Sequence, residues 1–233
     1  MLNLFLALMV STTLSFAGIP LLTDETKMTM QSPSVSLSFL LPSDALVKSY
    51  ERYQIKHMLQ EKALRAPVID KVMQSLDCAD KYGVEHTPIV TVIDYALPSN
   101  QKRFWVFDLK KKKVLFHTYV SHGIKSGLLR SEYFSNKHNS KASSIGVFKT
   151  KQSYYGRHGL AMRLKGLEPH INDYAEGRSI VMHGGWYMEE PFIKKYGRPG
   201  RSWGCPAIPK SITKHLINTI KGLRPYTAVN SVW

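Results

Sequence analysis

The residues best suited to covalent chemistry lie in two glycine-rich turns. One turn follows His183, which ends a β-like run and precedes Gly184 and Gly185, and the other presents Cys205 directly after Gly204. Glycine lets the backbone bend sharply, and such a turn can aim backbone N–H groups at one point, as an oxyanion requires. A thiol is a weak nucleophile at its unperturbed pKa of ~8.5, so it needs a base beside it. The two turns therefore predict a cysteine nucleophile with a histidine base.

This pair has two chemical forms and a structural alternative. The His183 imidazole either takes the proton of the Cys205 thiol or forms a thiolate–imidazolium pair with it. Taken singly, a cysteine is commonly a buried small hydrophobe, and a histidine after a strand is commonly structural. Both partners lie beside glycines in one domain, which favours the catalytic interpretation.

Several side chains near these turns could serve the same site. Ser202 could orient His183 by a hydrogen bond, or it could satisfy the backbone of its own turn. Arg198 and Arg201 could bias the site toward thiolate, and we favour for them the binding of a substrate carboxylate. His122 could line the cleft or be a structural histidine at a strand end.

Other candidates lie further from the two turns. Tyr155, with Arg157 and His158, could contact the substrate, although an aromatic loop commonly packs on its own domain. Gly184 is assigned to the substrate side of the site because it follows the base directly. Three carboxylates could orient the base, although we expect a backbone carbonyl to do so: Asp173, Glu189 and Glu190.

Nine histidines raise the question of a metal site. The sequence contains no His-x-Glu-x-x-His motif and no paired cysteine spacing of the kind that binds zinc. A triad of His158, His183 and Cys205 is a minor alternative. We therefore expect no metal and no cofactor.

Short runs rich in β-branched and aromatic residues predict a β-rich domain from about residue 88. Strands are expected at residues 89–95, 104–109, 114–120, 145–148 and 178–182, with the second and third joined as a hairpin by a turn of four lysines, and a helix is expected at about 210–221. The predicted fold class is mainly β with peripheral helices. Its architecture would be a mixed β-sandwich or barrel preceded by two N-terminal helices.

The chain before this domain divides into three segments. Residues 1–17 are uncharged and apolar and end in small residues, so we expect a signal peptide cleaved after Ala17 and an exported protein without a later membrane span. Residues 18–42 suggest a linker or arm. Residues 43–87 predict a helical appendage, with Ser43-Asp44 capping a first helix and Pro67 preceding a second at about 68–81.

The net charge of the chain indicates what kind of partner it would bind. The formal charge is +15 and the isoelectric point is about 9.8, which favours polyanions. Export argues against nucleic acid and favours an anionic cell-envelope polymer. Two cysteines, Cys78 and Cys205, are too few for a disulfide scaffold, and Cys78 lies in a helical pattern typical of a buried residue.

The two turns also carry a family resemblance. The L,D-transpeptidase catalytic domain has a histidine, a gap, and then Ser/Thr-His-Gly-Cys, and this chain has His183 followed by Ser202-Trp203-Gly204-Cys205. The chain is most similar to the divergent murein L,D-transpeptidase branch, because residues 200–207 read Gly-Arg-Ser-Trp-Gly-Cys-Pro-Ala. The resemblance extends over about residues 89–222, through residues 93–95, 106–109, 121–123, 134–136, 143–146 and 154–156.

This resemblance implies a substrate and a mechanism. Cys205 would attack the carbonyl after the third residue of a peptidoglycan stem peptide and expel the terminal D-alanine. His183 would act as base and then acid, and backbone N–H groups near Trp203, Gly204 and Cys205 would hold the oxyanion. The amine of another stem would resolve the thioester in transpeptidation, or water would do so in carboxypeptidation. The implied location is the bacterial periplasm or cell envelope.

The chain departs from the common family pattern at three places. Trp203 replaces a histidine, and Pro206-Ala207 replaces polar residues after the cysteine. The last ten residues, from Arg224 onward, lack the apolar pattern of a final strand. Three rivals therefore stay open: an L,D-carboxypeptidase or amidase on the same site, a non-catalytic peptidoglycan-binding protein, and a zinc peptidase.

Overall fold

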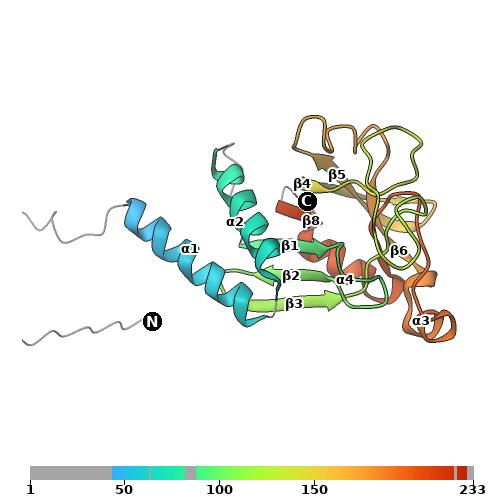
Figure 1. The fold of residues 1–233 in the computed structure, drawn as a ribbon, viewed down its shortest axis with the longest axis horizontal. Coiled ribbons are helices and arrows are strands. Elements are labelled where there is room, and N and C mark those ends of the chain that lie inside the picture. Colours follow the sequence, from blue (N-terminus) through green and yellow to red (C-terminus); the bar gives the residue numbers. More distant parts are fainter. Residues whose placement is uncertain (1–43, 63, 82–87, 223–224, 230–233) are drawn as a thin grey trace, which may run out of the picture. The chain divides into compact units, whose positions relative to one another are not determined.

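The computed structural model describes residues 44–62, 64–81, 88–222 and 225–229 (Figure 1). The expected signal peptide and linker, residues 1–42, lie outside the described residues, as does the side chain of Cys78. Cys205 is a free thiol. No helix within the described ranges is both long enough and apolar enough to cross a membrane.

Eight strands form one mixed sheet in the order β3-β2-β1-β8-β4-β5-β6-β7. The pairs β1–β8 and β6–β7 are parallel and the others are antiparallel. The mainly β class with peripheral helices is therefore confirmed. The strands are β1 (Ile89–Asp94), β2 (Phe104–Asp108), β3 (Lys113–Thr118), β4 (Gly146–Gly156), β5 (Gly159–Gly166), β6 (Val181–Gly185), β7 (Ala207–Pro209) and β8 (Pro225–Val229).

The two outer strands of this sheet are brought together by the chain that follows β3. The Ser121 N–H donates to the Ala207 carbonyl at 2.9 Å, and the Ala207 N–H donates to Ser121 Oγ at 3.0 Å. The sheet thus curls around one core, which is the barrel-like architecture expected. Helix α4 (Lys210–Ile220) buries its apolar face in this core. The core joins residues from both halves of the sheet: Ile93, Phe104, Phe148, Met162, Met182, Ile208, Leu216 and Ile217.

The N-terminal helices cover the other face of the first strands. Helix α1 (Asp44–Glu61) and helix α2 (Ala66–Lys81) lie beside β1–β3 in Figure 1. Side chains alternate along β1, so Ile89 and Ile93 enter the barrel core while Val90 and Val92 face the helices. Pro67 lies in the first turn of α2, where its missing N–H removes no helical hydrogen bond. The second core contains Met58, Leu59, Leu64, Val68, Val72, Leu76, Trp105 and Phe107.

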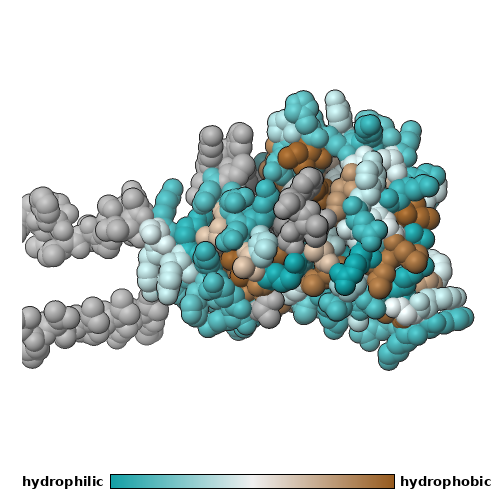
Figure 2. Space-filling view, viewed as in Figure 1, coloured by the Kyte–Doolittle hydropathy of each residue, from teal (hydrophilic) through white to brown (hydrophobic). Residues whose placement is uncertain are grey.

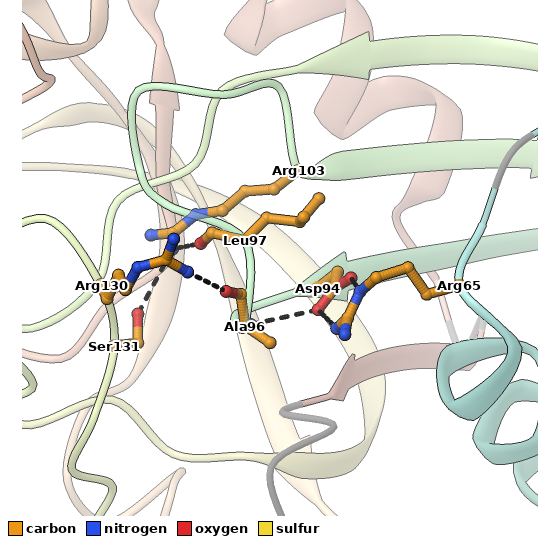
Figure 3. A network of polar contacts seen from close by, with 7 residues as sticks. All are labelled: Arg65, Asp94, Ala96, Leu97, Arg103, Arg130 and Ser131. Atoms are coloured by element: carbon orange, nitrogen blue, oxygen red, sulfur yellow. Dashed lines mark hydrogen bonds and ion pairs between the residues drawn. The ribbon is translucent and has the colours of Figure 1, made fainter.

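An ion pair joins the turn between these helices to β1 (Figure 3). Arg65 donates from Nε to Asp94 Oδ2 at 2.7 Å and from Nη2 to Asp94 Oδ1 at 2.6 Å. Asp94 Oδ1 also accepts from the Ala96 N–H at 3.1 Å, at the end of β1. The Asp94 side chain is only 2% exposed, so this pair orders both the helix connection and the turn after the strand.

The final strand was absent from the sequence prediction, which was wrong on this point. Strand β8 lies between β1 and β4, with Thr91 opposite Tyr226 and Gly146 opposite Ala228. Its sequence, Pro-Tyr-Thr-Ala-Val, has no apolar run, but tyrosine, threonine and valine favour strands, and proline is tolerated at a first strand position. Backbone pairing on both edges therefore defines the strand.

Three further elements escaped the sequence patterns. Strand β5 pairs with an extended β4, helix α3 (Glu190–Tyr196) follows a 3₁₀ turn η2 (Trp186–Met188), and β7 has only three residues. Short elements contain too few residues for a clear period. Strand β7 is decisive all the same, because it leads out of the Cys205 turn.

Candidate active site

Parallel pairing of β6 with β7 places the two candidate residues on adjacent strands. His183 lies opposite Ala207, and Cys205 precedes Ala207 by two residues, in the turn that leads into β7. His183 and Cys205 are 22 positions apart in the sequence, and strand pairing makes their segments neighbours in space. Backbone hydrogen bonds between the two strands set this register, so it does not depend on a particular side chain.

His183 is held as a neutral imidazole by its surroundings. Its side chain is buried, and Nδ1 lies 3.0 Å from the Gly184 carbonyl oxygen, which can only accept a hydrogen bond. Nδ1 therefore carries the proton and Nε2 has a free lone pair. Burial, and then the nearby charges of His158 and Arg157, lower the His183 pKa, while the Gly184 carbonyl opposes them. The His158 ring stacks on His183 with 4.5 Å between centroids.

Cys205 is half-buried and its sulfur lies 3.7 Å from the Ser179 carbonyl oxygen. Burial raises the pKa of the Cys205 thiol, and a backbone hydrogen bond at Val181 and the charge of Arg178 lower it in part. Both pKa shifts favour a protonated thiol on Cys205 and a neutral imidazole on His183 in the resting protein. Of the two chemical forms considered from the sequence, this arrangement favours proton transfer to a base over a preformed ion pair.

Ser202 serves the turn that contains the cysteine. Its hydroxyl donates to the Cys205 carbonyl at 2.5 Å and accepts from the Gly204 N–H at 3.1 Å. No hydrogen bond joins Ser202 to His183 among the described residues. The geometry corresponds to the alternative in which Ser202 satisfies its own turn, and the Gly204 N–H is thereby occupied. The N–H groups of Trp203 and Cys205 have no acceptor within the described part of the chain.

Only glycine fits at position 204. Gly204 has φ +118°, and a Cβ there would lie 2.6 Å from the Ala142 carbonyl oxygen. Gly184 meets a similar limit, because a Cβ would lie 2.5 Å from Thr213 Oγ1 in α4. Gly184 is buried, so its contribution to the site is its carbonyl, which holds His183, and the close approach of α4.

The exposed aromatic candidates lie at the surface around this turn. Trp203 is 69% exposed, and Lys141 Nζ lies 4.6 Å from its ring centroid. Tyr155 is 78% exposed near the end of β4, beside the β4–β5 turn. Both offer an accessible ring to a ligand, whereas a packing role would have buried them.

The two arginines of the turn form a basic pair. Arg201 Nη1 donates to the carbonyls of Ile124 at 3.1 Å and Gly127 at 2.9 Å, and Arg198 Nη1 donates to the Pro199 carbonyl at 3.1 Å. Burial, and then the charge of Arg198, lower the Arg201 pKa. Two neighbouring positive charges suit an anion, although Arg201 also ties its turn to the loop after β3.

His122 is engaged in a buried network. Arg103 Nη2 lies 2.8 Å from His122 Nδ1, and His122 Nε2 lies 3.1 Å from the Gly127 carbonyl oxygen. Arginine can only donate and a carbonyl can only accept, so His122 is the neutral Nε2–H tautomer. Burial, and then Arg103, lower the His122 pKa to about 4. With both nitrogens paired and no exposed surface, His122 has the structural arrangement considered from the sequence.

Arg103 is the centre of that network and was not singled out from the sequence. Its side chain is fully buried and donates to the carbonyls of Val120 and Leu97 and to Ser131 Oγ (Figure 3). The Tyr95 ring lies 5.1 Å from its guanidinium carbon. Nothing in a single arginine between a loop and a strand indicates such burial, so the sequence carried no signal for it.

None of the three carboxylates considered for orienting the base is hydrogen-bonded to His183 in the described part of the chain. Glu189 accepts from the Ser211 N–H at 2.8 Å at the start of α4, and Asp173 accepts from Asn136 Nδ2 at 2.7 Å. Glu190 begins α3. The Gly184 carbonyl holds His183 instead, as expected. Within the described residues, no three of the side chains His, Cys, Asp or Glu converge on a point that could hold a metal ion.

A groove of about 570 Å³ lies away from the two candidate residues. Its lining comes from β3, from the start of α3 and from the start of α4, and it includes neither Cys205 nor His183. The groove and the two candidate residues are therefore separate features of the described structure.

The described domain is a curled mixed sheet around α4, in which a Gly-Cys turn leads into β7 and the neighbouring strand β6 contains a buried histidine. The sequence profile of the L,D-transpeptidase catalytic domain family matches residues 60–226, which is more than half of the chain. The chain belongs to the L,D-transpeptidase catalytic domain family. No curated protein matches it.

Solved structures of similar proteins are distant in sequence. An L,D-transpeptidase from Mycobacterium smegmatis is 12% identical, with 61% of this chain and 58% of that chain covered and a TM-score of 0.38. A mutant L,D-transpeptidase from Enterococcus faecium is 13% identical, with 61% and 50% covered and a TM-score of 0.38. The helical cell shape determining protein Pgp2 from Campylobacter jejuni is 12% identical, with 61% and 47% covered and a TM-score of 0.37. The chain spans less than two thirds of each of these structures.

Proposed function

We propose that this protein is an exported peptidoglycan L,D-transpeptidase that works through a thioester on Cys205. The observation that supports the proposal is the β6–β7 register: the turn that contains Gly204 and Cys205 leads into β7, and β7 pairs with the strand that contains the buried His183. Family membership supports the reaction class. The proposed substrate is a peptidoglycan stem peptide, and the proposed location is the periplasm or cell envelope.

The first half-reaction follows from the protonation states of the pair. His183 Nε2 takes the thiol proton as Cys205 Sγ forms a bond to the carbonyl carbon after the third stem residue. The resulting oxyanion accepts hydrogen bonds from the N–H groups of Trp203 and Cys205, which are the donors left open in the turn. The C–N bond to the terminal D-alanine then breaks, and protonated His183 gives its proton to the leaving amine.

The second half-reaction returns the enzyme to its starting state. The side-chain amine of a second stem attacks the thioester carbonyl and passes a proton to His183, and the C–S bond breaks to leave a new amide. The released thiolate of Cys205 recovers the proton from His183. Water in place of the amine would give hydrolysis, which is the carboxypeptidase alternative.

Charge and surface features fit an anionic polymer substrate. The chain has a net charge of +15, and hydrophilic residues predominate among the described residues on the face shown in Figure 2. Arg198, Arg201 and the exposed Trp203 lie in the segment that leads to Cys205, and the exposed Tyr155 lies at the end of β4. We assign these four residues to substrate binding and leave His122 and Gly184 as supports of the site.

Intact-mass spectrometry with a tetrapeptide stem donor tests the proposal. The expected result is an adduct on Cys205 of the tripeptide acyl mass, absent from Cys205→Ala and strongly reduced in His183→Gln. Adding an acceptor stem should then give cross-linked dimers. Trimmed monomers without dimers would favour the hydrolase, and an absence of any adduct together with retained binding to sacculi would favour the non-catalytic binding protein. Loss of activity to chelators, with none to thiol alkylation, would favour the zinc peptidase.

A further inference from the structure

Arg178 lies just before β6 and holds a whole loop through its guanidinium group. It donates to the Ser135 carbonyl, to Ser144 Oγ at 2.5 Å, to Ser140 Oγ at 3.0 Å and to the Ala142 carbonyl at 2.7 Å. All four acceptors are neutral. No carboxylate forms an ion pair with Arg178 in the described part of the chain.

This network reaches the cysteine turn from two directions. The Ala142 carbonyl that Arg178 binds is the group that a Cβ on Gly204 would meet at 2.6 Å, so the loop packs directly against the residue before Cys205. Ser179, the next residue along the chain, lies with its carbonyl oxygen 3.7 Å from Cys205 Sγ. Arg178 thus connects both flanks of the thiol.

The backbone at Ser179 is held in an uncommon conformation. Its φ is +57°, in the left-handed region that an L-residue with a Cβ rarely adopts. Hydrogen bonds from the Ser179 N–H to the Glu176 carbonyl and from the Ile180 N–H to the Ala175 carbonyl hold this turn. Strained backbone of this kind persists where the surroundings demand one geometry, and here it places a carbonyl against the thiol.

The turn that contains the cysteine has little positive charge of its own to stabilise a thiolate. Trp203 precedes Gly204, Pro206-Ala207 follow the cysteine, and Arg201 is directed to the carbonyls of Ile124 and Gly127. The charge of Arg178 lowers the Cys205 pKa, and Cys205 in turn raises the pKa of Tyr95 and of Tyr187. His183 lies on the adjacent strand. Among these, only Arg178 is a permanent cation.

We propose that Arg178 is a positioning residue that seats the 135–144 loop against the Cys205 turn and stabilises the Cys205 thiolate by its charge. The effect on the thiol adds to the proposed catalytic role of Cys205 and rests on it. In the reaction above, the thiolate forms when His183 takes the proton and again when the thioester is resolved. A fixed cation whose acceptors are all neutral, and whose neighbour Ser179 contacts the sulfur, lowers the free energy of the thiolate at both moments.

Alkylation of Cys205 by iodoacetamide, followed at the Cys205 peptide by mass over about pH 6 to 10, tests this without any substrate. Arg178→Gln removes the charge, whereas Arg178→Lys keeps the charge and loses the paired Nη1 and Nη2 donors of the guanidinium group. Ser140→Ala with Ser144→Ala keeps the charge and loosens the loop. Lys110→Gln, in the exposed β2–β3 turn, is the control for loss of one positive charge far from the thiol.

The expected result separates charge from architecture. Arg178→Gln should slow alkylation near neutral pH about tenfold and shift the rate profile about one unit to higher pH. The alkylation rate should stay within about threefold of the parent in Arg178→Lys, in Ser140→Ala with Ser144→Ala, and in the control Lys110→Gln. The double serine variant should melt at a lower temperature. An unchanged profile in folded Arg178→Gln, or an equal shift in the double serine variant, would overturn the proposal.

Two safeguards keep the outcome interpretable. If Arg178→Gln fails to fold, the lysine and double serine variants decide, and a tenfold loss of reactivity in either one contradicts the charge role. The stem-peptide assay is separate: a missing acyl adduct with a normal Arg178 effect on alkylation would reject the proposed function and leave this inference about the thiol standing.

Discussion

At the scale of the residue, the protonation of each histidine depends on which of its ring nitrogens has a hydrogen-bond partner in the folded chain. Gly184 takes Nδ1 of His183 and leaves Nε2 open, whereas Arg103 and Gly127 take both nitrogens of His122. Two histidines that look alike in sequence, each at a strand end before a glycine, therefore differ in what they can do. The first can accept a proton and the second cannot do so without losing a hydrogen bond.

The buried His122 predicts a pH dependence of stability. Its pKa is about 4 in the folded state against an ordinary value of 6.5, so the unfolded chain binds a proton over this interval that the folded chain does not. Folding stability should therefore be independent of His122 above about pH 6.5 and should fall as pH drops from there to about 4. The loss should total about 3 kcal/mol.

Urea unfolding at several pH values measures this loss. The control is His122→Gln, which cannot titrate in this range but can still accept from Arg103 and donate to a carbonyl. The difference in unfolding free energy between the two proteins should shrink as pH falls from about 6.5 to 4. Parallel curves over that interval would show that His122 is not the neutral buried group described here.

At the scale of the element, the site depends on how closely α4 approaches β6. Gly184 gives the helix room, since a Cβ there would lie 2.5 Å from Thr213 Oγ1 and 3.2 Å from Lys210 Cα. The same glycine carbonyl holds His183. Helix packing and base orientation are therefore coupled through one residue of the strand.

Gly184→Ala should destabilise the protein by about 1–3 kcal/mol, because the methyl group overpacks the α4 contact. Unfolding by urea measures the loss. In a double-mutant cycle with Thr213→Ala, which removes Oγ1 and its hydrogen bond to the Pro209 carbonyl, the combined loss should be smaller than the sum of the two single losses. Strict additivity would mean that the Thr213 contact is not what excludes the methyl group.

At the scale of the whole molecule, the N-terminal helices and the barrel share a largely apolar boundary that contains the buried Arg65–Asp94 pair. This pair is bidentate, and the Asp94 side chain is 2% exposed while that of Arg65 is 39% exposed. Without Arg65, the buried Asp94 carboxylate would lose most of the interaction that offsets the cost of removing it from water. The family match begins at residue 60, near the end of α1, so it includes α2 and leaves out most of α1.

Arg65→Ala should lower the free energy of unfolding by about 2–4 kcal/mol. The matched control is Lys56→Ala, which removes an exposed helix pair to Asp70 at 3.6 Å and should change stability by less than about 1 kcal/mol. Chemical denaturation followed by circular dichroism measures both. Equal effects of the two substitutions would indicate that the buried ion pair does not hold the helices to the sheet.

Much of the framework could be predicted because it depends on local pattern. The strands near residues 89–95, 104–109 and 114–120 and the helix near 210–221 follow from side-chain periodicity, and β1, β2, β3 and α4 lie there. The cysteine and histidine turns stood out because glycine has a conformational meaning of its own. The short strand β7 and the central strand β8 did not, because pairing with distant partners defines them more than their residues do.

The sequence by itself therefore determined the β-rich class, the family resemblance and the two residues that could do chemistry, since each is written in local residue types and spacing. The tertiary structure decided what long-range contacts decide: that β8 completes the sheet between β1 and β4, that Ser202 serves its own turn, and that His122 is locked by a buried arginine. It also brought Arg178 to the cysteine turn, a neighbour that no sequence spacing announces. Hydrogen bonds, burial and charge act across space, and only the folded chain specifies which groups meet.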